Sequence, residues 1–213
     1  MDHDFWHSRW EANQIGFHQP KPNALMEAHL SQLALSPESR VFLPLCGKTL
    51  DLTWLVANGY RVVGAELSEL AIKQLFEELE IVPDVSEIGQ LKRYSVPRME
   101  VFVGDIFNLD RATLGPVDAV YDRAALVALP DGMRGQYARH LVEITATAPQ
   151  FLLTFTYDQS VMPGPPFSID AAEVNRHYDA IFDISKLASA DVKGGLKGIC
   201  PAIETAWKLK PRA

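Results

Sequence analysis

The sequence predicts an α/β fold: a doubly wound, mostly parallel sheet of seven strands with helices on both faces. Short, continuously apolar runs recur along the chain, as in strands that are buried on both faces of a parallel sheet. Segments with the apolar spacing of helices alternate with these runs. Two strand-like runs joined by a glycine-rich segment end the chain, and they predict an antiparallel C-terminal hairpin at the edge of the sheet.

Length, composition and charge limit the possible functions. The chain has 213 residues, of which 47% are apolar and 22% charged, and this fits a single domain over residues 1–213. Its formal net charge of −7 would repel nucleic acid, and no basic stripe offsets it. We therefore expect a small-molecule partner and no nucleic acid. We also expect a monomer, because no heptad pattern or long apolar patch indicates otherwise.

The cysteines and the start of the chain indicate the compartment. Cys46 and Cys200 lie far apart without a cysteine or histidine at metal-ligand spacing, which argues against a metal site and a disulfide framework. The start, Met1–Asp4, lacks a basic region followed by an apolar stretch, and no segment reaches about 18 apolar residues. We expect a cytoplasmic protein with no signal peptide, no transmembrane helix and no bound metal.

An N-terminal helical lid is expected over residues 1–36. Trp6 and Trp10 stand four residues apart, so they share one face of a helix that covers Phe5 to Trp10. Helical spacing also predicts a second helix from Asn23 to Leu35, which ends at a turn containing Pro37.

The middle of the chain, residues 37–160, carries the alternation of strands and helices. Strands are expected at Arg40–Leu45 and Arg61–Glu66, with a helix at Cys46–Leu55 between them. Ser68 is the expected cap of the next helix. The remaining expectations are an irregular stretch at 83–97, strands at 100–103, 117–121 and 151–156, and a helix capped by Asp131.

Residues 161–213 are expected to form a substrate loop and the C-terminal hairpin. The stiff segment Pro163–Phe167 precedes a short helix at Ala171–Tyr178. Strands at Ile181–Leu187 and Ala202–Leu209 flank the glycine-rich residues 194–198.

The carboxyl ends of the strands are where an open α/β sheet binds its ligands. Gly47-Lys48-Thr49 follows the first strand, but Phe42 replaces the first glycine of a phosphate-binding loop, and a dinucleotide-binding turn would need more glycines. Glu66 ends the second strand, where a carboxylate accepts hydrogen bonds from ribose hydroxyls, although such an acid can also be a solvated charge. A carboxylate placed for ribose, together with a turn that lacks the glycines of a phosphate-binding loop, favours a nucleoside without a pyrophosphate, such as S-adenosylmethionine.

Further candidates follow the next two strands. Asp105 and Ile106 are placed to flank an adenine ring. Arg123 is placed to meet a carboxylate or an electron-rich substrate, or else to form a structural ion pair with Asp122 or Asp105. The aromatic residues of the lid either wall an apolar pocket or belong to the core.

Several stretches spread over nearly the whole chain match one family. They are Trp6–Trp10 with Gly16–His18, Val41–Lys48, Val62–Ser68, Tyr121–Leu126, and Tyr157–Asp158 with Gly164–Phe167. Together they resemble the thiopurine S-methyltransferase family in its bacterial form, and the Pro-Leu-Cys-Gly-Lys and Gly-Pro-Pro-Phe pieces are the most specific. The resemblance implies a Rossmann-like, class I methyltransferase that uses S-adenosylmethionine, with residues 37–160 as its cofactor-binding core.

The resemblance also implies a reaction and the residues that serve it. The family methylates sulfur on thiopurines and on aromatic or heterocyclic thiols, and bacterial members are also linked to selenium and tellurium compounds. The cofactor contacts that the family implies fall on Trp10, Leu45, Glu66 and Arg123, with a segment of looser similarity at Asp105 and Ile106.

The expected chemistry is an in-line transfer of a methyl group from a sulfonium to a thiolate, for which the protein aligns the reactants and excludes water. Phe17 and Pro166 are expected to line the substrate slot, and Arg123 to position substrate or cofactor. Aromatic thiols ionise easily, so a general base can be absent; His18 or Asp158 would serve if one is used. His18 can also be an ordinary surface or core histidine.

Other functions stay open on the sequence alone. The first alternative is methylation of selenium or tellurium compounds, which would serve metalloid detoxification and tellurite resistance. A nicotinamide-dependent oxidoreductase can use the same sheet, but the missing glycines after the first strand disfavour it. A more distant alternative is a non-catalytic protein that binds a metabolite or an oxyanion.

Overall fold

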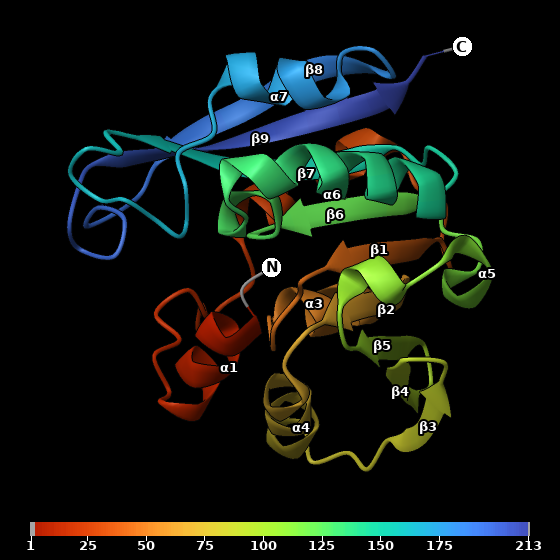
Figure 1. Cartoon of the computed structure of the whole chain (residues 1–213). Coiled ribbons are helices and arrows are strands. Elements are labelled where there is room, and N and C mark those ends of the chain that lie inside the picture. Colours follow the sequence, from red (N-terminus) through yellow and green to blue (C-terminus); the bar gives the residue numbers. More distant parts are fainter. Residues whose placement is uncertain (1–2, 213) are drawn as a thin grey trace.

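A computed structural model describes residues 3–212 of the chain (Figure 1). Met1 and Asp2, which open the segment expected to lack a signal peptide, lie outside the described residues. Between residues 3 and 212, no helix combines the length and the apolar character that crossing a bilayer requires.

Within residues 3–212, nine strands form one sheet in the order β3-β4-β5-β2-β1-β6-β7-β9-β8. The five central strands, β5 to β7 in that order, are parallel, and an antiparallel hairpin borders them at each edge. The strands are β1 (Arg40–Pro44), β2 (Arg61–Glu66), β3 (Asp84–Ile88), β4 (Leu91–Val96), β5 (Met99–Val103), β6 (Ala119–Arg123), β7 (Gln150–Tyr157), β8 (Phe182–Asp191) and β9 (Ala202–Pro211). The predicted doubly wound fold with a C-terminal hairpin is confirmed, but the expected number of seven strands is wrong.

The two additional strands are β3 and β4, in the stretch that was expected to be irregular. They pair antiparallel with each other, and β4 pairs antiparallel with β5. All residues of β3 except Ile88 are exposed, so the strand lacks the alternation of apolar and polar residues that marks a half-buried strand. The prediction failed because β3 is an edge strand with little apolar surface to bury.

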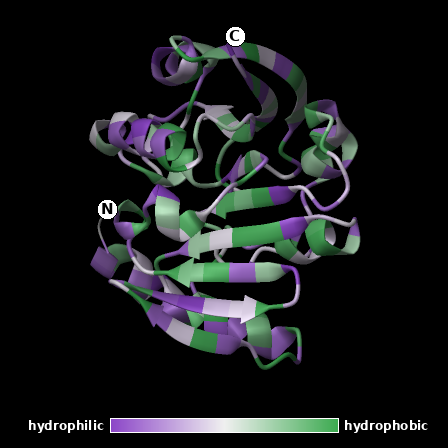
Figure 2. Ribbon diagram, turned by 90° about the vertical axis from the view of Figure 1, so that its right-hand side faces the viewer, coloured by the Kyte–Doolittle hydropathy of each residue, from purple (hydrophilic) through white to green (hydrophobic). Residues whose placement is uncertain are grey.

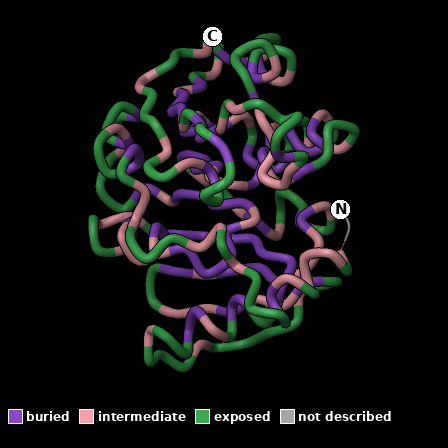
Figure 3. The backbone as a smooth tube through the Cα atoms, turned by 90° about the vertical axis from the view of Figure 1, so that its left-hand side faces the viewer, coloured by how far each residue is buried: buried purple, intermediate pink, exposed green. Residues whose placement is uncertain are grey.

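Helices cover both faces of the sheet. On one face lie α2 (Ala24–His29), α3 (Asp51–Ala57) and α4 (Glu69–Glu78), and on the other α5 (Arg111–Leu114), α6 (Asp131–Ile144) and α7 (Ala171–Tyr178). Figure 2 shows hydrophobic residues concentrated along the central strands, and Figure 3 shows burial following the same strands. By contrast, α1 (His3–Glu11) lies beyond the sheet on the side toward which β1 and β6 point (Figure 1).

Several of these helices are capped at their N-terminus by a side chain. Asn23 accepts hydrogen bonds from two backbone N–H groups at the start of α2, and Ser68 accepts one from the N–H of Ala71, which confirms it as the cap of α4. Asp131 is not the cap of α6, because it is the first helical residue and Pro130 holds the cap position. The carboxylate of Asp131 instead accepts a hydrogen bond of 2.6 Å from Arg176.

The connection from β1 to α3 differs from the prediction. The expected helix at Cys46–Leu55 begins only at Asp51, because Leu45 and Gly47 have φ values of 48° and 54°, which a right-handed helix excludes. The chain therefore enters α3 through an irregular turn. At the end of β6 the strand runs on to Arg123, two residues beyond its expected end.

The order of the strands defines where a ligand can bind. After β1 the chain adds β2 on one side, and it later returns to add β6 on the other side. The connections that leave the carboxyl ends of these strands diverge, which opens a crevice at this topological switch point.

Candidate active site

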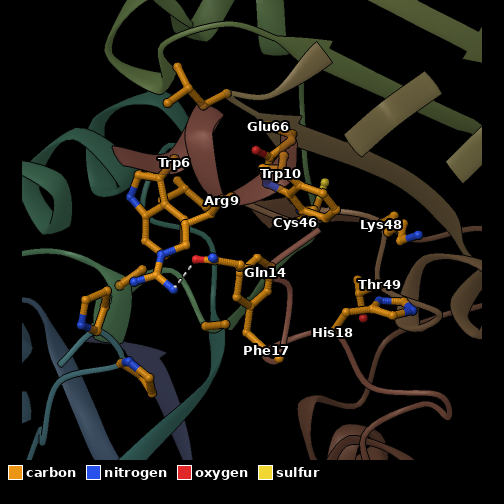
Figure 4. A pocket seen from close by; sticks show the side chains of 18 of the residues that line it. Trp6, Arg9, Trp10, Gln14, Phe17, His18, Cys46, Lys48, Thr49 and Glu66 are labelled. Carbon is orange, nitrogen blue, oxygen red and sulfur yellow. Dashed lines mark hydrogen bonds between the residues drawn. The ribbon is translucent and has the colours of Figure 1, made fainter. Parts of the chain in front are cut away.

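A cavity of about 480 Å³ lies at the carboxyl ends of β1, β2 and β6 (Figure 4). Its walls come from α1 and the segment that follows it, from the turn after β1, and from two loops near the C-terminus. Its lining includes Trp6, Arg9, Trp10, Gln14, Phe17, His18, Leu45, Cys46, Gly47, Lys48, Thr49, Glu66, Arg123, Pro165, Pro166 and Lys197. Small-molecule sites in proteins have volumes of about 300–1,000 Å³, so the cavity has a suitable size.

The carboxylate of Glu66 is fixed in the wall of this cavity at the end of β2. Its Oε2 accepts a hydrogen bond of 2.7 Å from the backbone N–H of Gly47, and its Oε1 accepts one of 2.9 Å from Ser68. Burial raises the pKa of Glu66, and the backbone donors partly offset this rise. Each carboxylate oxygen has a further lone pair, so the group can accept hydrogen bonds from hydroxyl groups of a ligand.

Aromatic rings of the N-terminal segment close the cavity. Phe17 makes edge-to-face contacts with Trp6 and Trp10, with ring centroids 5.7 and 5.5 Å away. The two tryptophans therefore point to the same side of α1, as their spacing predicts. Trp10 lies directly over Gly47, where an added Cβ would stand 3.2 Å from the indole ring. The glycine thus allows the ring to rest on the turn after β1.

Arg123 extends from the end of β6 into the lining of the cavity. The two structural partners considered for it are engaged elsewhere: Asp122 accepts a hydrogen bond of 2.7 Å from the buried Tyr137, and Asp105 lies 3.0 Å from His3. Within residues 3–212, no carboxylate lies at ion-pair distance from Arg123. Its guanidinium is therefore available to an anionic group of a ligand.

Two titratable residues in the lining are neutral near pH 7. Burial lowers the pKa of His18, and the positive charge of Lys48 lowers it further, so the imidazole is free to accept a proton. Burial raises the pKa of Cys46 well above its usual value, and the charge of Glu66 adds to the rise. Cys46 therefore stays a thiol and does not act as a nucleophile. No group of three His, Cys, Asp or Glu side chains in the described part of the chain is arranged to hold a metal ion.

Comparison with known proteins identifies the family. A family model for thiopurine S-methyltransferase (TPMT) matches residues 1–199. The chain belongs to the thiopurine S-methyltransferase family. The family expected from the sequence is thus confirmed, and the chain is a methyltransferase of the S-adenosylmethionine-dependent class.

Relatives of the chain carry the same family name. The thiopurine S-methyltransferase of Xanthobacter autotrophicus is 52% identical and covers 99% of both chains. Those of Teredinibacter turnerae and Gluconobacter oxydans are 47% and 42% identical, over 98% and 97% of this chain and 97% and 94% of their own lengths.

Solved structures of low sequence identity share the fold of this thiopurine S-methyltransferase family member. An S-adenosylmethionine-dependent methyltransferase from Anabaena variabilis superposes with a TM-score of 0.63 at 13% identity, over 99% of this chain and 95% of the other. The 1,6-didemethyltoxoflavin-N1-methyltransferase of Burkholderia thailandensis, with bound 1,6-didemethyltoxoflavin and S-adenosylhomocysteine, gives 0.62 at 15% identity, over 98% and 87%.

The cavity of the family member brings together most of the residues singled out from the sequence. Trp10, Phe17, His18, Leu45, Glu66, Arg123 and Pro166 all line it. Three others do not. Asp105 caps a short turn by accepting a hydrogen bond from the N–H of Phe107, Ile106 is buried in the core, and Asp158 is exposed and bonded to Ser160.

Sequence reasoning missed several polar residues of the lining. Arg9 follows Trp6 by three residues, and this helical spacing could have indicated that both face the ligand. Lys48 and Thr49 were not predicted as site residues, because the phosphate-binding loop that would contain them was excluded. Lys197 had no local signal, because the loop between β8 and β9 brings it to the cavity, where its Nζ donates a hydrogen bond of 2.6 Å to the carbonyl of Pro165.

Proposed function

We propose that the protein transfers a methyl group from S-adenosylmethionine to the sulfur of thiopurines and of other aromatic or heterocyclic thiols. The observation that carries the proposal is a single cavity in which the carboxylate of Glu66 faces an aromatic wall of Trp6, Trp10 and Phe17. The carboxylate suits a ribose, and the apolar wall suits a flat aromatic acceptor. Membership of the thiopurine S-methyltransferase family supports the same reaction.

The residues present fit S-adenosylmethionine. Glu66 is held by two backbone donors at the strand end where ribose hydroxyls bind in this class of fold. The turn after β1 has no run of glycines and therefore no cradle for a pyrophosphate, which this cofactor lacks. A free cationic side chain, Arg123, stands in the same lining for the carboxylate of the methionine part.

Each residue of the proposed cofactor site then has one role. Glu66 accepts hydrogen bonds from the ribose hydroxyls, Leu45 contacts the methionine part from the end of β1, and Trp10 covers that part. Arg123 binds the methionine carboxylate and so sets the position of the reacting end. We leave Asp105 and Ile106 out of the proposed adenine contact, because neither lines the cavity.

The proposed reaction requires that the protein align the two reactants and exclude water from them. When bound, S-adenosylmethionine supplies a methyl group on a positively charged sulfur. Phe17 and Pro166 line the slot that receives the acceptor, and their apolar surfaces keep water from the approaching sulfur. His18 is neutral and can take the proton of an acceptor that arrives as a thiol, whereas Asp158, which is exposed, has no part in the proposal.

A competition of acceptors tests the proposed function. Purified protein with labelled S-adenosylmethionine is offered a thiopurine, a simple aryl thiol, selenide and telluride, and the kcat/KM values are compared. We expect the aromatic thiols to give the highest values. Label on selenide or telluride alone would instead identify a metalloid methylase. Binding of S-adenosylhomocysteine without transfer to any acceptor would identify a non-catalytic binding protein.

A further inference from the structure

Asp122 is a buried carboxylate that stands directly before Arg123 in β6 and that the proposed reaction does not use. Its side chain does not line the cavity, whereas that of Arg123 does. Neighbouring side chains of a strand point to opposite faces of the sheet. Asp122 therefore faces α6, and Arg123 points to the other face, toward Thr49. Any effect of Asp122 on a ligand must pass through the chain that follows it.

Three donors in the described part of the chain hold this carboxylate. Its Oδ1 accepts a hydrogen bond from the backbone N–H of Ala125 and another from that of Leu126, both 3.2 Å long. Its Oδ2 accepts one of 2.7 Å from the phenol of Tyr137, which is fully buried in α6. The carboxylate therefore ties the turn after β6 to the helix that covers this face of the sheet.

The turn that the carboxylate holds has an unusual backbone. Ala124 has a φ of 71°, a left-handed conformation that residues other than glycine rarely adopt. The short helix η3 (Leu126–Ala128) follows at once, and its own cap residue, Ala125, has no side-chain acceptor for the first N–H groups. Asp122 supplies this acceptor from the strand before the turn. The direction in which Arg123 leaves the strand therefore depends on the contact between Asp122 and the start of η3.

The guanidinium of Arg123 has few other contacts that fix its position. Its Nη1 donates a long hydrogen bond of 3.5 Å to the hydroxyl of Thr49, and no carboxylate within residues 3–212 lies at ion-pair distance from it. The side chain is therefore positioned mainly by its backbone. A cation binds a ligand carboxylate more tightly when its position is set before the ligand arrives.

Stability does not account for the charge of Asp122. No cation pairs with it in the part of the chain that the structure describes. Burial raises its pKa to about 6 in spite of its hydrogen bonds, so a charged carboxylate near pH 7 makes the fold less stable. The charge strengthens the hydrogen bonds to the backbone N–H groups and so holds the turn more firmly. A buried charge that lowers stability beside a ligand-binding side chain indicates a functional requirement.

We propose that Asp122 is a positioning residue for the cofactor site: by holding the turn at Ala124 it fixes Arg123 where the methionine carboxylate of S-adenosylmethionine binds. This inference rests on the role of Arg123 in the proposed function. Asp122 contacts no ligand, and its loss leaves Glu66, the residue for the ribose, in place. The defect of an Asp122 variant is therefore confined to ligands with a carboxylate, and it disappears once Arg123 is absent.

A pair of related ligands tests this role. S-adenosylhomocysteine carries the amino-acid carboxylate, and 5′-methylthioadenosine has the same nucleoside and sulfur without it. Both are titrated by calorimetry into the unchanged protein, Asp122→Ala, Arg123→Ala and the variant with both substitutions. We expect Asp122→Ala to bind S-adenosylhomocysteine about tenfold more weakly and 5′-methylthioadenosine equally well. In the double variant the loss should equal that of Arg123→Ala, because Asp122 acts only through this side chain.

Three further variants separate positioning from folding. Leu141→Ala removes a buried side chain from α6, one turn beyond Tyr137, and should lower the Tm while both ligands bind as in the unchanged protein. Asp122→Asn keeps an oxygen for the two backbone N–H groups and should bind S-adenosylhomocysteine within about threefold of the unchanged protein. Tyr137→Phe removes one hydrogen bond of the carboxylate with little change of shape, and should lose about threefold in affinity for S-adenosylhomocysteine alone.

An equal loss of both ligands in Asp122→Ala would overturn the proposal, because the residue would then support the fold as a whole. A loss in the double variant that multiplies the two single losses, or an unchanged affinity for S-adenosylhomocysteine in Asp122→Ala, would overturn it too. If Asp122→Ala does not fold, Tyr137→Phe decides, and an equal effect on both ligands, or none, rejects the role. Protein that shows the expected affinities but methylates no thiol would support the role of Asp122 and reject the proposed function.

Discussion

The carboxylate of Glu66 accepts a hydrogen bond from the backbone N–H of Gly47, and this contact joins the end of β2 to the turn after β1. Gly47 in turn lies under the indole ring of Trp10. A strand end, a turn and α1 therefore meet at one point of the cavity wall. Changes at this point are expected to alter ligand binding more than they alter folding.

Replacing Glu66 by alanine should weaken the binding of S-adenosylhomocysteine by about 10- to 100-fold. Hydrogen bonds to a charged group contribute about 1.5–3 kcal/mol each, and the proposed ribose contact would be lost. Calorimetry on the folded variant measures the affinity. The control is Glu87→Ala on the exposed strand β3, which should bind as the unchanged protein does. Equal affinity in the Glu66 variant would remove this residue from the cofactor site.

The affinity for S-adenosylhomocysteine should also depend on pH through Glu66. Burial raises the pKa of this carboxyl group, so the free protein takes up a proton at a higher pH than an exposed glutamate would. The proton must leave before the carboxylate can accept hydrogen bonds from both ribose hydroxyls, and affinity should fall as the pH is lowered through the raised pKa. Titrations from pH 4 to 8 test this. In Glu66→Gln the affinity should be lower and nearly independent of pH, and a parallel pH dependence in both proteins would contradict the assignment.

Replacing Gly47 by alanine should disturb Trp10. The residue has a φ of 54°, which costs an L-residue about 1 kcal/mol, and the new Cβ would stand 3.2 Å from the indole ring. We expect a Tm lower by a few degrees, a changed tryptophan fluorescence spectrum and several-fold weaker binding of S-adenosylhomocysteine. The matched control is Gly132→Ala in α6, where nothing lies within 4 Å and alanine should stabilise the helix. Unchanged fluorescence and affinity in Gly47→Ala would show that the ring tolerates the methyl group.

Replacing Arg123 by alanine should abolish most turnover while leaving the fold intact. The residue has no ion pair in the described part of the chain, so its loss breaks no salt bridge. We expect kcat/KM for an aryl thiol to fall by about 100-fold, because a preorganised cation near the reacting groups is lost. Steady-state kinetics and circular dichroism give the two readouts. Arg111→Ala, an exposed substitution in α5, is the control, and full activity of Arg123→Ala would refute its role.

The free energy of unfolding should decrease as the pH is raised from 4 to 6, because of Asp122. Burial raises the pKa of this group to about 6, although hydrogen bonds from Tyr137 and two backbone amides favour its charged form. In this window the folded protein holds a proton that the unfolded chain has released, so the free energy of unfolding decreases as the pH rises and levels off above pH 6. At about 1.4 kcal/mol per pH unit, the decrease is on the order of 3 kcal/mol. Urea unfolding of the protein and of Asp122→Asn measures the difference, and the variant should lack this component.

The strand ends were predictable because their signals are local. The apolar run of Arg61–Glu66 marks a buried strand, and its last residue must then lie at the carboxyl edge of the sheet, where Glu66 is found. Arg123 followed from the same reasoning even though β6 ends two residues later than expected. Trp10 and Phe17 were found through a combination of helical spacing and family resemblance.

The rest depends on tertiary contacts that no local pattern reveals. Lys197 reaches the cavity only because β8 and β9 pair along their length and project their connecting loop toward Pro165. Asp105 stands after the third parallel strand, as expected, but α1 supplies His3 as its partner and the carboxylate lies outside the cavity lining. The strand β3 is exposed on both faces, so its formation depends on pairing with β4 rather than on hydrophobic periodicity.

The helix α1 carries both tryptophans of the cavity wall, Trp6 and Trp10, so the proposed cofactor and acceptor would both contact one short element. The helix packs on neither face of the sheet; it rests on the turn at Gly47, contacts α4 and pairs His3 with Asp105. Two ligands that bind against the same helix are expected to affect each other's affinity, and any factor by which the first changes the affinity for the second must apply equally in reverse. A coupling between donor and acceptor would thus pass through one short helix of the chain.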